Sequence, residues 1–121
     1  MEKEKFEALV GEALADIPAN FKDLLKNVVV MVESRPPRGR RLLGLYHGVP
    51  YKYRGPEYGN VAPDVIVIYQ WPIERMCSSD DEVRNEVRMT VLHEVGHYFG
   101  LEESTLREIE EELRKTNGHG E

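Results

Sequence analysis

The spacing of apolar residues divides the first third of the chain into helical and extended segments. Apolar side chains recur at helical spacing near the start, at Phe6, Leu9, Val10, Ala13 and Leu14. This pattern predicts a helix over residues 2–16 that stops before Pro18, and a short helical piece is expected over residues 20–25. The apolar run at residues 28–32 is too short for a helix. We interpret it as a buried strand, because it is too apolar for an edge.

Two further strands are expected in the middle of the chain. The arginine, proline and glycine residues at 35–39 are typical of a loop. Residues 42–47 then predict a strand that ends at residues 48–50, and residues 51–53 are interpreted as the return arm of a hairpin. An irregular stretch over residues 55–63 leads to a third apolar strand at residues 65–69.

The remainder of the chain predicts two helices with defined ends. Ser79 and Glu82 have the spacing of a capping box, in which the serine hydroxyl binds an amide of the first turn and the glutamate reaches back. The helix is expected to run from residue 80 to residue 99, with Gly100 as a left-handed cap. A second box, at Thr105 and Glu108, is expected to open a final helix that ends near residues 117–118.

Length and composition indicate one globular domain over residues 1–121. The chain is 40% apolar and 31% charged, and its formal net charge is -6. This acidic balance argues against a nucleic-acid partner. Arginines do cluster in the first loop, and we interpret them as a solvated loop because charged runs usually face water. They are Arg35, Arg38, Arg40 and Arg41.

Cysteine usage and the first residues bear on the compartment. Cys77 is the only cysteine, so an intrachain disulfide is excluded and a reducing compartment is expected. The charged first ten residues lack the apolar core of a signal peptide, and no apolar run approaches the ~18 residues of a spanning helix. These features predict a cytoplasmic protein with no membrane partner, and we expect a monomer.

Three ionisable side chains interrupt the apolar second half of the long helix. Burying two imidazoles and a carboxylate is costly unless they are paired or bind a metal. His93 and His97 are four residues apart, so a helix places both rings on one face, where they can reach one ion. Glu94 is turned by about 100° around the helix, which keeps it out of the ligand set but within reach of a metal-bound water. The H-E-x-x-H spacing is that of a zinc hydrolase.

A zinc peptidase needs a third protein ligand, and the sequence offers several acidic residues for it. Gly100 permits a sharp change of direction, after which Glu103 stands six residues past His97. We favour Glu103 for this reason, with Glu102 as its adjacent rival. The acidic residues of the final helix are looser candidates, namely Glu108, Glu110, Glu111 and Glu112.

Residues 88–103, RMTVLHEVGHYFGLEE, resemble the active-site segment of small bacterial zincin-like proteins, a family of minimal metzincin-type zinc metallopeptidases. The resemblance extends upstream through residues 42–50 and the strand at residue 28, and so covers nearly the whole chain. It implies an α+β fold made of an N-terminal helix, a small mixed sheet, an active-site helix and a C-terminal helix. It also implies zinc as cofactor and an acidic third ligand at the position of Glu103, often aspartate in the family. One departure from metzincins is that no methionine follows Glu103 to form a methionine turn.

Together these features predict a zinc-dependent peptidase that acts on peptide or protein substrates. Glu94 would act as general base toward a metal-bound water, while zinc polarises the peptide carbonyl. The substrate would lie extended along a sheet edge over residues 42–53. Tyr46 or Tyr98 is available to an oxyanion, although an aromatic core role is favoured for both. The alternatives are a zinc-containing binding or regulatory module without turnover, hydrolysis of a non-peptide amide, and iron in place of zinc.

Overall fold

The computed structural model describes residues 1–56 and 62–119, and the side chains up to residue 115 within them. The irregular stretch expected over residues 55–63 therefore lies largely outside the described residues. In chain order the elements are α1 (Lys3–Ala15), α2 (Ala19–Lys22), β1 (Val28–Glu33), β2 (Gly44–His47), the 3-10 helix η1 (Tyr51–Tyr53), β3 (Asp64–Tyr69), α3 (Gln70–Arg75), α4 (Asp80–Phe99) and α5 (Glu103–His119).

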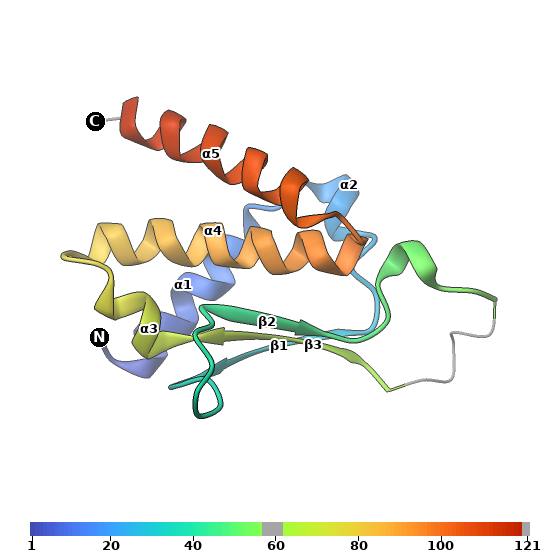
Figure 1. Ribbon diagram of the computed structural model, residues 1–121, viewed down its shortest axis with the longest axis horizontal. Helices are drawn as coiled ribbons and strands as arrows, with labels where there is room; N and C mark the ends of the chain where they lie inside the picture. Colours follow the sequence, from blue (N-terminus) through green and yellow to red (C-terminus); the bar gives the residue numbers. More distant parts are fainter. Residues whose placement is uncertain (57–61, 120–121) are drawn as a thin grey trace.

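The elements are arranged in layers (Figure 1). In the three-stranded sheet, β3 lies between β1, which runs parallel to it, and β2, which runs antiparallel. α1 and α4 cover one face of the sheet, and α5 lies on the side of α4 that faces away from it. This combination of helices and a small mixed sheet confirms the expected α+β fold.

β1 is an edge strand, so its interpretation as a buried strand that is too apolar for an edge is wrong. Among the described residues it pairs with β3 alone. Its alternate side chains point away from the helical layer, and Val29 is 45% exposed and Met31 42% exposed, whereas Val32 is buried. The apolar composition of this segment indicates its β propensity but not how many strands pair with it. The number of paired strands depends on how many strands the whole chain forms.

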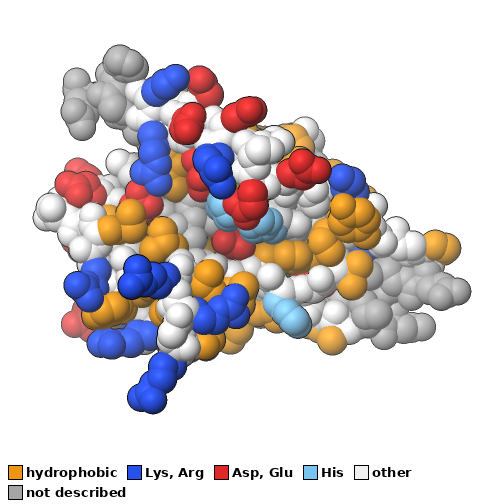
Figure 2. All heavy atoms as spheres, viewed as in Figure 1, with side chains coloured by type: hydrophobic (Ala, Val, Ile, Leu, Met, Phe, Trp, Pro, Cys, Tyr) orange, Lys and Arg blue, Asp and Glu red, His pale blue; other side chains and the backbone are white. Residues whose placement is uncertain are grey.

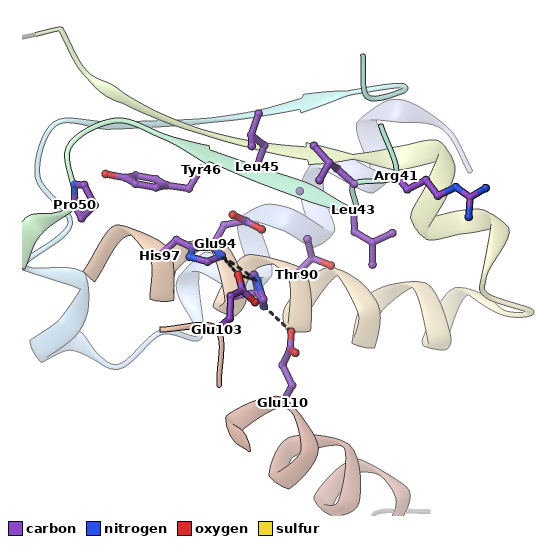
Figure 3. A pocket seen from close by; sticks show the side chains of 13 residues that line it. Arg41, Leu43, Leu45, Tyr46, Pro50, Thr90, Glu94, His97, Glu103 and Glu110 are labelled. Carbon is purple, nitrogen blue, oxygen red and sulfur yellow. Dashed lines mark hydrogen bonds and ion pairs between the residues drawn. The ribbon is translucent and has the colours of Figure 1, made fainter. Parts of the chain in front are cut away.

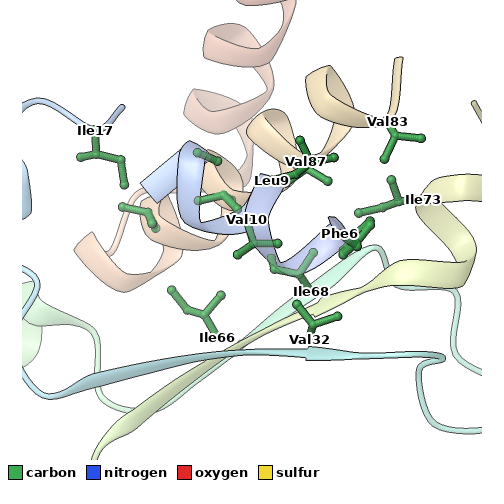
Figure 4. Packing of buried hydrophobic residues seen from close by; sticks show 13 residues of the cluster. Phe6, Leu9, Val10, Ile17, Val32, Ile66, Ile68, Ile73, Val83 and Val87 are labelled. Atoms are coloured by element: carbon green, nitrogen blue, oxygen red, sulfur yellow. The ribbon is translucent and has the colours of Figure 1, made fainter. Parts of the chain in front are cut away.

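The core lies between the covered face of the sheet and the helices α1 and α4 (Figure 4). Phe6 from α1, Ile68 from β3 and Val87 from α4 are fully buried. Each such side chain contributes roughly 1.5–3 kcal/mol by leaving water. Ile73 adds α3 to this cluster. The apolar pattern did not predict α3, because it is a short helix with Pro72 in its first turn, where the missing amide is tolerated.

α4 has the bounds that the sequence predicts, and both of its ends are capped as expected. The Ser79 hydroxyl accepts a hydrogen bond from the Glu82 amide at 3.2 Å, and the Glu82 carboxylate reaches back to the backbone that precedes the helix. At the other end Gly100 adopts a φ of 84°, and the Leu101 amide donates to the Gly96 carbonyl at 3.0 Å. This left-handed turn sends the chain back across α4.

α5 begins at Glu103, so the predicted capping box at Thr105 and Glu108 is wrong. The Leu106 amide donates to a carbonyl four residues earlier at 3.0 Å, which already closes a helical turn. Leu106 is 3% exposed and packs directly over Gly96 of α4, where a Cβ would lie 2.1 Å from Leu106 Cδ2. This contact between helices sets where α5 begins, and a local cap pattern does not encode it.

Residues 51–53 form η1 rather than the expected return arm of a hairpin, and β2 is shorter than the strand predicted over residues 42–47. The Tyr53 amide donates to the Pro50 carbonyl at 2.9 Å, which closes the 3-10 turn. The Tyr51 ring lies 6.1 Å from the rings of both Tyr98 and Phe99. This aromatic packing against the end of α4 draws the segment away from the sheet. Among the described residues β2 therefore has β3 as its one strand partner.

Candidate metal site

The two histidines of the motif lie side by side on one face of α4. Their Nε2 atoms are 3.1 Å apart and their ring centroids 4.7 Å apart. The His93 side chain is 22% exposed and the His97 side chain 29% exposed. The four-residue spacing explains the shared face. The partial exposure leaves both rings accessible to an ion from solvent.

Glu103 is the acidic residue that the turn at Gly100 brings to the two rings. Its Oε1 atom lies 2.8 Å from His97 Nε2 and 3.4 Å from His93 Nε2. With the 3.1 Å between the two Nε2 atoms, these separations approach the edges of about 3.4 Å in a tetrahedral site whose bonds are about 2.1 Å long. Two imidazole nitrogens and a carboxylate oxygen are donors that zinc accepts. The residues present therefore fit a zinc ion.

The other acidic candidates for a third ligand lie outside this group. Glu102 is exposed, and within the described part of the chain no hydrogen bond or ion pair joins its side chain to either histidine. Three of the acidic residues of α5 are also exposed, namely Glu108, Glu111 and Glu112. Of the rivals considered from the sequence, Glu110 alone reaches a histidine among the described residues.

Glu94 is buried next to the histidines. It is 6% exposed, and one of its carboxylate oxygens lies within 4.8 Å of a ring nitrogen of each histidine. The Tyr46 backbone hydrogen-bonds this carboxylate. Burial raises the pKa of Glu94 from 4.5 to about 7; nearby His93 and the Tyr46 hydrogen bond oppose this shift, whereas the negative charges of Glu103 and Glu110 add to it. A carboxyl group with such a pKa exchanges protons readily near neutral pH.

Glu110 contacts His93 from the opposite side of the imidazole ring. Glu110 Oε1 lies 2.9 Å from His93 Nδ1, whereas Nε2 of the same ring faces His97 and Glu103. A carboxylate at Nδ1 holds the ring proton there and leaves the Nε2 lone pair for a metal. Glu110 follows Glu103 by seven residues, two turns along one face of α5. This seven-residue spacing is the feature of the sequence that places Glu110 on the same face as Glu103. Spacing alone does not distinguish a metal ligand from a residue that orients a ligand.

A cleft of ≈ 480 Å³ connects these residues with β2 (Figure 3). Its lining comes from α4 and α5 on one side and from β2 with its flanking residues on the other, between Pro50 at one end and Arg41 at the other. The strand approaches α4 closely because residue 44 is glycine. A Cβ on Gly44 would lie 2.8 Å from Thr90 Cγ2 and 3.1 Å from Glu94 Cγ. The edge strand β2 therefore borders the cleft.

Comparison with known proteins identifies the family of this chain. The family described as zincin-like metallopeptidase matches residues 25–113. The chain belongs to the zincin-like metallopeptidase family. This match confirms the resemblance carried by residues 88–103.

This chain is also similar to a protein of known structure. A conserved hypothetical protein from Thermus thermophilus is 28% identical to this zincin-like chain, with a TM-score of 0.56, over 82% of this chain and 94% of that one. A search of curated proteins finds no match. Within residues 1–56 and 62–119, no helix is both long and apolar enough to cross a membrane.

The zincin-like chain uses both candidate tyrosines in its framework. Tyr98 is fully buried, and its hydroxyl donates to the Leu24 carbonyl at 2.7 Å. The Tyr46 hydroxyl donates to the carboxylate of Asp64, which also pairs with Arg54. Burial and the Asp64 carboxylate raise the pKa of Tyr46 well above its ordinary value. Both hydroxyls thus have structural partners, which favours the core role over contact with an oxyanion.

Proposed function

We propose that this member of the zincin-like family is a zinc-dependent peptidase in which His93, His97 and Glu103 hold the metal and Glu94 is the general base. One observation carries the proposal: two Nε2 atoms and a Glu103 oxygen converge beside a buried carboxylate, in a cleft that an edge strand borders. Zinc, when bound, supplies Lewis-acid chemistry that polarises a carbonyl and acidifies water.

Glu94 has the position and the proton affinity of a general base. Its carboxylate can take a proton from the attacking water and return it to the leaving amine. A pKa of about 7 in the metal-free protein favours both steps, although a bound cation would lower this value again. The hydrogen bond from the Tyr46 backbone ties the carboxylate to β2, so the strand that borders the cleft also orients the base.

Among the described residues no strand pairs with the second edge of β2, and this open edge supports a peptide as substrate. An extended peptide can pair with an exposed strand edge through its backbone, which gives affinity with little dependence on side chains. β2 has β3 on one side, and its residues line the cleft that contains the histidines. A peptide paired there would pass its scissile carbonyl close to the candidate metal donors.

A zinc-containing binding or regulatory module without turnover is the second candidate. A structural zinc site has four protein ligands and needs no free carboxylate beside them. In this chain His93, His97 and Glu103 converge, and Glu94 is buried next to them. Among the described residues no Lys or Arg forms an ion pair with Glu94. These features favour the peptidase. The cytoplasmic location and the monomeric state stay predictions.

Bound metal and peptide cleavage, measured on the same variants, test the proposal. We expect about one zinc per chain in the wild type by elemental mass spectrometry, lost in His97→Ala and Glu103→Ala and retained in Glu102→Ala. Glu94→Gln should keep its zinc and lose cleavage of a peptide library. A wild type that holds no zinc after loading and dialysis would refute the proposal. Zinc without cleavage would favour the binding module.

A further inference from the structure

A second surface of the chain carries concentrated positive charge. The loop between β1 and β2 contributes Arg35, Arg38, Arg40 and Arg41, all exposed, and neighbouring α3 contributes Trp71 and Arg75. Figure 2 shows Lys and Arg side chains gathered at the lower left, over this loop, whereas acidic and basic side chains are interspersed over α5. The formal net charge of the whole chain is -6. The basic surface, as we call these six residues, is therefore a local feature against the overall charge.

Trp71 organises the basic surface. The guanidinium carbon of Arg35 lies 4.2 Å from the centroid of the Trp71 ring, and that of Arg75 lies 4.6 Å away. Trp71 itself is 38% exposed. A guanidinium over an indole ring gains cation–π attraction without losing its charge or its hydrogen-bond donors. Both arginines thus stay available to a ligand while their positions are restricted.

The arginines of this surface have no acidic partners within residues 1–56 and 62–115. Arginines elsewhere do pair with carboxylates: Arg84 with Glu12 at 3.5 Å and Arg114 with Glu86 at 2.6 Å. No such ion pair involves the five arginines of the basic surface in the described part of the chain. Like charges held close together repel one another unless an anion lies between them.

The loop that carries the arginines is attached at both ends. The Trp71 amide donates to the Ser34 carbonyl at 2.9 Å, and the Tyr69 amide donates to the Leu43 carbonyl at 2.9 Å. Between these bonds the Arg40 amide closes a turn, and Pro36 and Pro37 restrict the backbone. A loop restrained in this way loses little conformational freedom on binding a ligand.

The basic surface is continuous with the candidate active site. The loop, Trp71 and Pro72 line a hollow of ≈ 510 Å³. Arg41, Leu42 and Leu43 line both this hollow and the cleft that contains the histidines. Arg41 lies at the end of the cleft that is remote from Pro50 (Figure 3). A polypeptide extended along β2 toward that end would reach the arginines next.

We propose that the basic surface binds an acidic segment of the polypeptide substrate, on the same chain as the bond to be cleaved. This inference rests on the proposed peptidase function and names the substrate class. A polypeptide fits better than a nucleic acid, because the hollow has apolar walls at Pro36, Pro37 and Leu42 and leads into the cleft.

Trp71 provides the test, since it is the only tryptophan in the chain. The protein is the full-length Glu94→Gln variant, which keeps the basic surface and would not consume a substrate. The probe is a glutamate-rich peptide without tryptophan or tyrosine, compared with the same peptide carrying glutamine at each glutamate. We expect a saturable change of Trp71 fluorescence with the first peptide and none with the second. The affinity should fall as salt is added.

Matched variants locate the binding, read by fluorescence anisotropy of the labelled peptide. Arg35→Gln combined with Arg38→Gln should weaken binding about tenfold, from the loss of two exposed ion pairs. Arg84→Gln combined with Arg88→Gln removes the same charge from α4, and should leave the affinity unchanged. Equal binding of both peptides, or equal affinities of the two double variants, would overturn the inference.

Two further outcomes separate this inference from the proposed function. The first is competition by a single-stranded oligonucleotide. If the oligonucleotide displaces the acidic peptide, and its affinity falls more than that of the peptide in the Arg35→Gln, Arg38→Gln variant, the ligand is a nucleic acid and the polypeptide assignment is overturned. The binding assay requires neither zinc nor turnover. Acidic-peptide binding without any cleavage would therefore refute the peptidase and keep the acidic-segment site, whereas cleavage without preference for acidic peptides would refute the site alone.

Discussion

Replacing Glu110 with glutamine should weaken zinc binding about tenfold without removing a ligand. Glu110 Oε1 lies 2.9 Å from His93 Nδ1, on the ring nitrogen that faces away from His97 and Glu103. The carboxylate fixes the ring orientation, and its charge makes Nε2 a stronger donor. A glutamine amide oxygen can still accept the Nδ1 proton, so the variant removes the charge and keeps most of the geometry.

The size of this effect follows from the surroundings of the Glu110 carboxylate. Loss of such an orienting partner typically costs 10–100-fold in metal affinity, or about 1.4–2.7 kcal/mol. The Glu110 side chain is 25% exposed, so water screens part of its charge. We therefore expect the lower end of the range for Glu110→Gln. Glu110→Ala also removes the orientation of the ring and should approach the upper end, about a hundredfold.

Competition with a zinc chelator measures these affinities directly. Glu111→Gln is the matched control, because it makes the same charge change one residue along α5 at an exposed position, and its zinc affinity should stay at the wild-type value. Identical zinc affinities for Glu110→Gln and Glu111→Gln would refute the orienting role. A complete loss of zinc in Glu110→Ala, as severe as in His97→Ala, would also refute the orienting role, because it would identify Glu110 as a ligand.

Three further predictions concern the framework of the site. Gly44→Ala should lower the free energy of unfolding, measured in urea, by about 1–3 kcal/mol, because its Cβ would lie 2.8 Å from a side-chain atom of α4. The same variant should hydrolyse peptides more slowly. The control is Gly11→Ala, whose Cβ would have nothing within 4 Å and which should raise the free energy of unfolding by about 0.5–1 kcal/mol. In metal-free protein, burial raises the pKa of Glu94 from 4.5 to about 7. The folded state therefore binds this proton more tightly than the unfolded state. The resulting contribution to the free energy of unfolding, about 3 kcal/mol, is fully present below pH 4.5 and is lost as the pH rises through about 7. Glu94→Gln should lack this loss, and parallel stability curves for the two proteins against pH would contradict the reasoning. Tyr46→Phe should cost about 1–2 kcal/mol, because it removes a donor to the buried Asp64, yet it should retain zinc and turnover; loss of turnover with zinc retained would return the Tyr46 hydroxyl to the catalytic candidates.

Local features of the sequence determined the element that carries the chemistry. The bounds of α4 follow from Ser79 and Glu82 at one end and Gly100 at the other, since each cap acts within one turn of the backbone. The shared face of His93 and His97 follows from helix geometry alone. These features need no knowledge of the rest of the chain, and the family resemblance rests on the same residues.

Only the tertiary structure decided what surrounds those residues. Burial of Leu106 over Gly96 starts α5 earlier than its own cap pattern predicts, and Glu110 then lies against His93 Nδ1. Packing of Tyr51 on the end of α4 removes the expected hairpin arm and leaves β2 at the open edge of the cleft. A residue's spacing along its own element says which face it occupies, whereas its partners across elements depend on packing between segments far apart in the chain. That packing is a property of the whole core, and a local pattern does not contain it.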